Sequence, residues 1–250
     1  MEINAISLTF LEIPAELTQE YNRWYDLDHM PEHVSKADVV AGRRYVAPSE
    51  LRAVEGVLPS ELLDGYPPYL TTYLFGGPLD FREAEAKSGW TVMDQRIVRA
   101  GRFWQAGDVV HSSWWTLRSS HARPSVHVAE PAIAHLGHRG VIAALGRAPS
   151  VERRQEAADW WDRTHLDDLF AVPGVLAVLR FDPVEPLDQD LLLHLVLCES
   201  PPADVMAGVD QQRRYDTAIG RWPAHKGVYE PLAWMPFQRI VPLEYDFDVD

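Results

Sequence analysis

The feature that most constrains the fold of this chain is an internal repeat. When the 250-residue sequence is shifted by 136 positions, the pattern Trp-aromatic-Asp-x-x-His at residues 24–29 falls on the same pattern at residues 160–165. The match continues along the chain: Val39, Ala41, Arg44 and Tyr45 align with Val175, Ala177, Arg180 and Phe181. Coincidence does not account for a match that includes Trp and His. A repeat at this spacing predicts two copies of one structural unit.

A second pair of matching segments locates an insertion in the first copy. Residues 102–106, RFWQA, resemble residues 221–224, RWPA, and align Trp104 with Trp222 at a shift of 118. The smaller shift predicts extra residues in the first copy, and they are found in the Pro- and Gly-containing stretch 48–69. We therefore expect a first repeat over 1–119 with a long inserted loop at 48–69, a linker over 120–136, and a second repeat over 137–250.

The two repeats have the same predicted order of elements. In the first, INAISLTFLEI alternates and is rich in β-branched residues, which predicts a strand, and residues 16–30 follow with helical spacing. Strands are also predicted at VVAGRRYVA, YLTTYLFG and DVVHSSWWTLRS, with a second helix over 79–99. The second repeat has strands at RGVIAALGR, GVLAVLRFD, LLLHLVLCE and YEPLAWMPF, and helices over 151–169 and 202–218. The order βαββαβ is that of a ferredoxin-like unit.

A ferredoxin-like unit leaves one face of its antiparallel sheet uncovered, because both helices pack on the other face. Two such units bury these faces when they come together. We expect an α+β fold in which two tandem ferredoxin-like βαββαβ repeats pack sheet-to-sheet as an intramolecular α+β barrel. Because the two repeats form a pseudo-dimer within one chain, a second chain is not needed to close the barrel. A further homodimer of two such chains is also compatible with the sequence.

Composition and charge exclude several classes of partner. The formal net charge of −14 opposes binding to nucleic acid or to an anionic membrane surface. Cys198 is the only cysteine, which excludes an intrachain disulfide. The N-terminus lacks the basic and apolar regions of a signal peptide, and no apolar run approaches the roughly 20 residues of a membrane span. No HExxH pattern is present, and no metal site is expected. A cytoplasmic protein with a hydrophobic small-molecule substrate is predicted.

The repeated helical motif is a candidate catalytic site. On a helical wheel Tyr21, Tyr25 and His29 share a face, and Asp26 precedes His29 by three positions, a spacing at which helical side chains meet. We expect Asp26 to orient His29 and raise its basicity, and Pro31 to end or bend the helix just past His29. The same residues can instead pack the helix on its sheet and brace it. Their recurrence in the second copy favours this packing interpretation.

Further candidates lie on the predicted strands and are expected to point into the barrel. His111 and Trp115 share one face of the fourth strand, and Tyr69 and Tyr73 share one face of the third. Together with Arg44 or its neighbour Tyr45, they indicate an aromatic-rich small-molecule pocket. The expected catalytic residues are His29, Asp26 and His111, the expected substrate-binding residues are Tyr25, Tyr69, Tyr73, Trp115, Arg44 and His194, and the second-copy equivalents are Asp162 and His165.

The motif also resembles a known family. The run Tyr21-Asn22-Arg23-Trp24-Tyr25-Asp26-x-x-His29-x-Pro31-Glu32 is similar to the helix signature of the EthD-like branch of the dimeric α+β barrel superfamily, and VAGRRY at 40–45 is similar to that family's second strand. The second copy lacks the Asn and has Asp167-Asp168 in place of Pro-Glu. The resemblance implies the barrel fold. It implies activity only broadly, because the superfamily includes cofactor-free cyclases, isomerases and monooxygenases as well as haem-binding enzymes.

Three functions are compatible with these observations. The favoured one is a cofactor-free enzyme of cyclase, isomerase, dehydratase or decarboxylase type, which uses His-mediated proton transfer on a hydrophobic ring-containing or polyketide-like molecule. The second is a haem-binding oxidoreductase with His111 or His194 as axial ligand. The third is a non-catalytic small-molecule-binding accessory protein. We expect the chemistry in the first copy, where the signature is complete and the inserted loop is placed to act as a lid.

Overall fold

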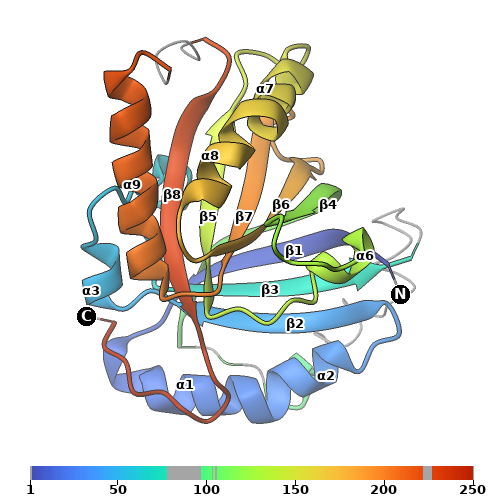
Figure 1. Ribbon diagram of the computed structural model, residues 1–250. Coiled ribbons are helices and arrows are strands. Elements are labelled where there is room, and N and C mark those ends of the chain that lie inside the picture. The colour runs from blue at the N-terminus through green and yellow to red at the C-terminus, as the bar shows by residue number, and fades with distance from the viewer. Residues whose placement is uncertain (1, 78–96, 103, 105, 222–226, 250) are drawn as a thin grey trace.

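The strands of the protein close into one barrel. The computed structural model describes residues 2–77, 97–102, 104, 106–221 and 227–249 (Figure 1). Within them the barrel order is β1-β3-β2-β8-β5-β7-β6-β4, with every neighbouring pair antiparallel. The strands are β1 (Ile3–Glu12), β2 (Val39–Val46), β3 (Tyr69–Gly76), β4 (Asp108–Ala122), β5 (Gly140–Arg147), β6 (Val175–Pro183), β7 (Leu191–Cys198) and β8 (Glu230–Arg239).

Each half of the barrel has the strand order expected of a ferredoxin-like unit. The first half contributes β4-β1-β3-β2 and the second contributes β8-β5-β7-β6, so the first and third strands of each unit lie in the middle. The two halves join at two seams of unequal length. Strands β4 and β6 pair from Trp115 to Ala122, whereas β2 and β8 pair only at Tyr45 and Val46. The predicted α+β architecture, two tandem repeats closed into an intramolecular barrel, is confirmed.

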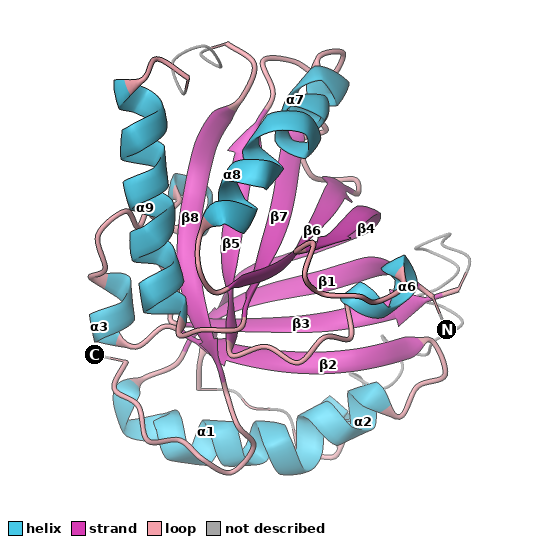
Figure 2. Ribbon diagram, in the orientation of Figure 1, coloured by secondary structure: helices cyan, strands magenta, loops and turns pink. Residues whose placement is uncertain are grey.

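The helices cover the outside of the barrel. Figure 2 shows α1 and α2 along the sheet of the first half and α7, α8 and α9 along the sheet of the second. The main helices are α1 (Thr18–Trp24), η2 (Tyr25–His29), α2 (Met30–Val34), α7 (Arg154–Trp160), η4 (Trp161–His165), α8 (Leu166–Ala171) and α9 (Pro202–Ala218). Shorter ones are η1 (Ala15–Leu17), α3 (Ser49–Arg52), η3 (Glu61–Leu63) and α6 (Glu130–Ile133). No helix in the described part of the chain is long and apolar enough to cross a membrane.

Two of the sequence predictions lie outside the described residues. The second helix of the first repeat, expected over 79–99, is described only at 97–99, which are helical. The segment RWPA is described only at Arg221. The expected linker over 120–136 contains the end of β4 and the short helix α6, because the last residues of β4 continue to pair with β6. The domain limits of the sequence analysis stay predictions.

The interior of the barrel is a packed apolar core. Alternate residues of all eight strands point inward, among them Leu8, Leu70, Trp115, Leu193 and Phe237, each no more than 5 % exposed. A cavity of about 30 Å³ lies beside His111, Ser113 and Trp115, which is room for a water molecule. This cavity is too small to admit a substrate, so the expected substrate pocket inside the barrel stays a prediction.

The inserted loop of the first repeat packs against the second half. The backbone of Leu58 exchanges two hydrogen bonds with that of Trp234 on β8, at 3.1 and 2.9 Å, and Glu55 forms an ion pair with Arg214 on α9. The loop thus extends the seam at which β2 and β8 pair over only two residues. Leu63 of the same loop packs into the barrel core. The expected role of the loop as a lid stays a prediction.

The close packing of this seam makes a glycine essential at the start of β5. A Cβ on Gly140 would overlap the carbonyl oxygen of Phe237 and the ring of Pro202, whereas a Cβ on Gly137 meets nothing within 4 Å. We expect Gly140→Ala to lower the free energy of unfolding by about 1–3 kcal/mol, because backbone atoms must move to admit the methyl group. Urea denaturation measures the loss. Gly137→Ala is the matched control, and equal losses in the two variants would contradict this packing.

Candidate functional site

The repeated sequence motif forms a π-helical turn in both halves. Segments η2 and η4 are π-helices at positions separated by the repeat shift, and in each the following residue donates its N–H five residues back, Met30 to Tyr25 and Leu166 to Trp161. Turns of this type are rare in proteins, and those that occur are often found at functional sites. The second turn forms without a proline, so Pro31 is not its cause. The expected helix end just past His29 is wrong, since α2 continues to Val34.

An arginine on the second strand of each half binds the aspartate of the motif. Arg44 Nη1 lies 2.8 Å from Asp26 Oδ1, and both side chains are almost completely buried. In the second half Arg180 Nη2 lies 3.6 Å from Asp162 Oδ2, and Asp162 is 31 % exposed. The recurrence of the motif therefore has a structural basis: an ion pair between helix and strand, which is tight and buried in the first half and looser in the second.

Asp26 joins a helix and a strand of the first half to the C-terminal segment of the chain. Its Oδ1 accepts from Arg44, while its Oδ2 accepts from the Tyr245 hydroxyl at 2.6 Å and from the Leu243 N–H at 3.1 Å. Arg44 also donates to the side-chain oxygen of Asn22. Because both carboxylate oxygens are engaged in this way, the geometry supports a positioning role for Asp26 on Arg44 and on the C-terminal segment rather than on His29.

The basicity of His29 differs from the expectation. Burial, followed by the nearby His33, Arg44 and Lys36, lowers the pKa of His29 to about 3. A helix C-terminus favours a protonated imidazole, but none lies at His29, because the helix continues to Val34. At neutral pH His29 is therefore an uncharged imidazole, which accepts or donates a hydrogen bond but is a weak base.

Four other side chains surround His29 beneath the helix, and the five together are called the first-half cluster: Tyr25, His29, His33, Arg44 and Tyr73. The hydroxyls of Tyr25 and Tyr73 lie 3.1 Å apart. The rings of His29 and His33 have centroids 4.1 Å apart, and the guanidinium of Arg44 lies 4.2 Å from the centroid of Tyr25. Burial raises the pKa of Tyr73 well above 10, so its hydroxyl stays protonated.

His33 was missed as a catalytic candidate from sequence. Its Nδ1 lies 2.9 Å from the carbonyl oxygen of His29, which is an acceptor only, so Nδ1 donates the hydrogen bond. The imidazole is 1 % exposed and its ring centroid lies 5.4 Å from that of Tyr73. The sequence feature that indicates His33 is its spacing of four residues from His29, which places both imidazoles on one helical face. This inference requires a helix that continues past Pro31.

The corresponding positions of the second half are mostly apolar. By the repeat shift Tyr25 corresponds to Trp161 and His33 to Leu169, and by strand register Tyr73 corresponds to Val196. His165 is retained but stacks on Trp160, with centroids 5.1 Å apart and planes at 12°. The second half has therefore replaced the phenols and one imidazole of the cluster with a packed core.

The structure brings together only part of the predicted site. Tyr25, His29, Arg44 and Tyr73 meet in the first-half cluster, and Tyr69 lies beside it, within 3.4 Å of Asn22. His111 and Trp115 are separated from them by the sheet, since they line the barrel interior.

Several strand residues face the opposite side from that expected. Tyr69, Tyr73 and His194 point toward the helices, because leucines at the alternate positions of β3 and β7, including Leu70 and Leu193, fill the barrel. Of the neighbours Arg44 and Tyr45, it is Tyr45 that belongs to the barrel core. His194 packs flat on Trp161, with centroids 3.6 Å apart. The alternation of each strand was visible in the sequence, but its phase relative to the core was not.

Comparison with known proteins establishes the fold. An anthrone oxidase-like protein has a TM-score of 0.54 at 13% identity, over 96% of this chain and 92% of that one. A putative chlorite dismutase has a TM-score of 0.56, and a dye-decolorizing protein from V. cholerae has a TM-score of 0.55. Each is 10% identical in sequence, over 97% of this chain and 96% of the other. The fold is the dimeric α+β barrel. No family model and no curated protein matches the chain, so membership of the EthD-like branch stays a prediction.

The comparison corrects two expectations about chemistry. Chlorite dismutases and dye-decolorizing proteins are haem-binding, so these neighbours point toward haem and contradict the expectation that the chain has no cofactor. The neighbours are also oxidase-, monooxygenase- and dismutase-like, which gives the expected lyase or isomerase reactions no support.

The two histidines expected as haem ligands do not fit a porphyrin in this structure. An axial histidine must present a ring nitrogen to a space of roughly 300 Å³ or more. His111 faces a cavity of about 30 Å³. Neither ring nitrogen of His194 has a hydrogen-bond partner among the described residues, which suits a metal ligand, but the imidazole is 1 % exposed beneath Trp161.

Removal of the aspartate charge is expected to lower the free energy of unfolding by different amounts in the two halves. Asp26→Asn leaves the buried Arg44 charge without its counterion, and we expect a loss of about 3 kcal/mol in the free energy of unfolding. Asp162→Asn is the matched variant in the second half, and because Asp162 is partly exposed we expect a loss of no more than about 1 kcal/mol. Urea denaturation of both proteins measures the difference, and equal losses would refute the assignment of Asp26 as the buried brace.

Buried neutral histidines predict a stability that falls in acid. Burial lowers the pKa of His138 to about 4 and that of His194 well below 6.5. The unfolded chain binds these protons at a higher pH than the folded protein does. The contribution of the neutral histidines to the free energy of unfolding is therefore fully present above about pH 6.5. It is lost as the pH falls toward about 4, by up to about 1.4 kcal/mol per pH unit for each histidine.

A variant at His194 tests this dependence. His194→Phe keeps a ring against Trp161 and removes one titrating group, so we expect a smaller slope of unfolding free energy against pH between 6.5 and 4.5. The slope is measured by urea denaturation at several pH values, with His135→Gln at an exposed position as control. A slope equal to that of the wild type would show that His194 is not neutral in the folded protein.

Proposed function

We propose that this chain is an oxidoreductase for a hydrophobic, ring-containing small molecule, which it handles at the first-half cluster. The observation that carries the proposal is the asymmetry between the halves. Two phenols and two imidazoles meet under the first π-helical turn, whereas the second half has Trp161, His165, Leu169 and Val196 at the corresponding positions. The side chains of the second half show that apolar residues at these positions are sufficient to pack the helix on the sheet. The polar side chains of the first half therefore serve a purpose other than packing. The oxidase- and dismutase-like neighbours support the reaction class.

The protonation states of the cluster define what it does to a substrate. Tyr25 and Tyr73 offer hydroxyl groups at the same point, and the raised pKa of Tyr73 keeps that hydroxyl a donor. Such donors stabilise negative charge as it forms on a ketone or phenol oxygen. His29 is neutral and accepts a hydrogen bond from the substrate. Arg44, fixed by Asp26, supplies a positive charge over the Tyr25 ring. The cluster thus favours the enolate or phenolate form of a ring substrate, which is the form that oxidants attack.

Oxygen uptake with anthrone as the probe tests the proposal. In the reaction one anthrone and one O₂ give anthraquinone and water: the ring methylene loses two hydrogens and gains one oxygen atom, and the second oxygen atom leaves as water. We expect turnover by the wild type and a loss of about 10²-fold in Tyr73→Phe, because the donor at the developing oxyanion is removed. Tyr229→Phe is the matched control, since Tyr229 is a buried tyrosine of the second half.

The assay is run on the protein as isolated and after one equivalent of hemin. Equal rates in Tyr73→Phe and Tyr229→Phe would place the chemistry elsewhere. Absence of oxygen uptake under both conditions would refute anthrone-type oxidation by this chain.

Haem dependence is the second candidate, and the chlorite dismutase and dye-decolorizing neighbours favour it. Titration with hemin, followed by absorbance near 400 nm, tests it without turnover. A sharp band with an end point at one equivalent supports haem binding, and its loss in His29→Ala, His111→Ala or His194→Ala would identify the ligand. A featureless titration would exclude haem as the cofactor.

A further inference from the structure

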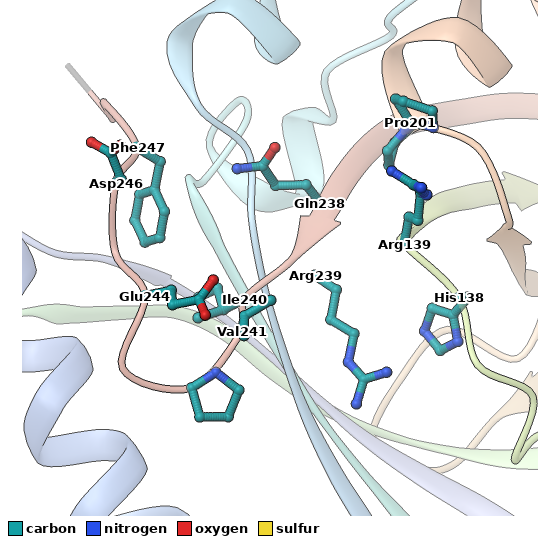
Figure 3. A pocket seen from close by; sticks show the side chains of 12 residues that line it. His138, Arg139, Pro201, Gln238, Arg239, Ile240, Val241, Glu244, Asp246 and Phe247 are labelled. Atoms are coloured by element: carbon teal, nitrogen blue, oxygen red, sulfur yellow. The ribbon is translucent and has the colours of Figure 1, made fainter.

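The short seam between the halves carries a second, separate cleft. It has a volume of about 630 Å³ and lies between the end of β8, the start of β5 and the C-terminal segment 240–247 (Figure 3). Its wall includes Arg139, Arg239 and His138, and its apolar lining includes Pro201, Ile240 and Phe247. None of these residues belongs to the first-half cluster.

Arg139 and Arg239 form a cross-strand pair of like charge. Gly140 pairs with Gln238, so Arg139 and Arg239 occupy the next pair of positions, and the N–H of Arg239 donates to the carbonyl oxygen of Arg139 at 2.8 Å. Like charges directly opposite one another in a sheet destabilise it. In Figure 3 the two guanidinium groups point away from each other, one toward Pro201 and one toward His138.

The two arginines lack the partners that most arginines of this chain have. The protein has 37 acidic and 23 basic residues, and arginines such as Arg102, Arg147 and Arg214 bind two carboxylates each. Among the described residues the side chains of Arg139 and Arg239 form no ion pair or hydrogen bond, and both are exposed to the cleft. Both guanidiniums are therefore available to an anion that enters the cleft from outside.

The cleft also contains two carboxylates, and among the described residues neither forms an ion pair with Arg139 or Arg239. Glu244 and Asp246 lie on the C-terminal segment across the cleft from the arginines, and both are exposed to solvent (Figure 3). His138 adds no charge, since burial lowers its pKa to about 4, and both ring nitrogens are engaged, by the Tyr45 hydroxyl and by the carbonyl oxygen of Leu136, each at 2.9 Å. This anchored imidazole makes the wall beneath Arg239 rigid.

We propose that this cleft binds a small organic oxyanion, with its carboxylate or phosphate group on the wall that carries Arg139 and Arg239 and an apolar body against Pro201 and Phe247. A guanidinium pairs with such a group through two parallel N–H donors. The bound anion also relieves the repulsion between the two arginines. The site is independent of the proposed oxidoreductase activity.

Thermal unfolding tests the proposal with defined probes. Benzoate, inorganic phosphate and the neutral benzamide are added in turn, with chloride adjusted to keep the ionic strength constant. We expect benzoate or phosphate to raise the Tm of the wild type by about 2–4 °C at a few times its Kd, and benzamide to have no effect. A response to benzoate alone assigns a carboxylate with a ring, and a response to phosphate assigns a phosphate group.

Variants of the arginines separate a ligand site from a structural pair. Arg139→Gln and Arg239→Gln are expected to lose the response to the anion while being at least as stable as the wild type in chloride, because each relieves the like-charge pair. Arg163→Gln, at a position 80 % exposed on η4, removes the same charge elsewhere and is expected to keep the response. Any of three results would overturn the proposal. The first is that neither anion stabilises the wild type, the second is that Arg239→Gln responds as the wild type does, and the third is that either cleft variant is less stable than the wild type in chloride.

Discussion

The buried ion pair of Arg44 and Asp26 is the interaction on which the first half depends. A guanidinium that is 5 % exposed is tolerated only with a carboxylate beside it, and here the carboxylate also binds Tyr245 and the Leu243 N–H. One charge pair therefore fixes a helix, a strand and the C-terminal segment relative to each other. It also holds a positive charge against the Tyr25 ring, so that the phenols and imidazoles under the π-helical turn are placed by the same contact that stabilises the fold.

Much of the architecture was predictable because it depends on features that repeat. Alternation of apolar residues marked the strands, the shift of the Trp-Asp-His motif marked the two copies, and the βαββαβ order determined how they combine. Local backbone detail was not accessible in this way. A π-helical turn has no simple periodicity, and the proline at 31 suggested a helix end, although an extra residue in the preceding turn lets the helix pass it.

The candidate site was predictable in its members but not in its geometry. The spacing of Tyr25 and His29 correctly indicated one helical face, yet Asp26 is held by Arg44, an interaction 18 residues away in sequence that only the fold creates. The strand candidates failed for a different reason: alternation says that Tyr69 and Tyr73 share a side, but which side is the barrel depends on the volumes of Leu70 and Leu74 against the facing strands. Burial, followed by the nearby His33, Arg44 and Lys36, lowers the pKa of His29 and reverses the expected basicity.

Joining two units in one chain removes a symmetry that a dimer must obey. In a two-fold dimer both seams are identical, and any cleft at one occurs again at the other. Here β4 and β6 pair along most of their length while β2 and β8 pair at two residues, so the two ends of the pseudo-dimer are different surfaces. The arginine-lined cleft lies at the short seam. A ligand bound there has a stoichiometry of one per chain, and the second copy is free to carry tryptophan and leucine where the first carries tyrosine and histidine.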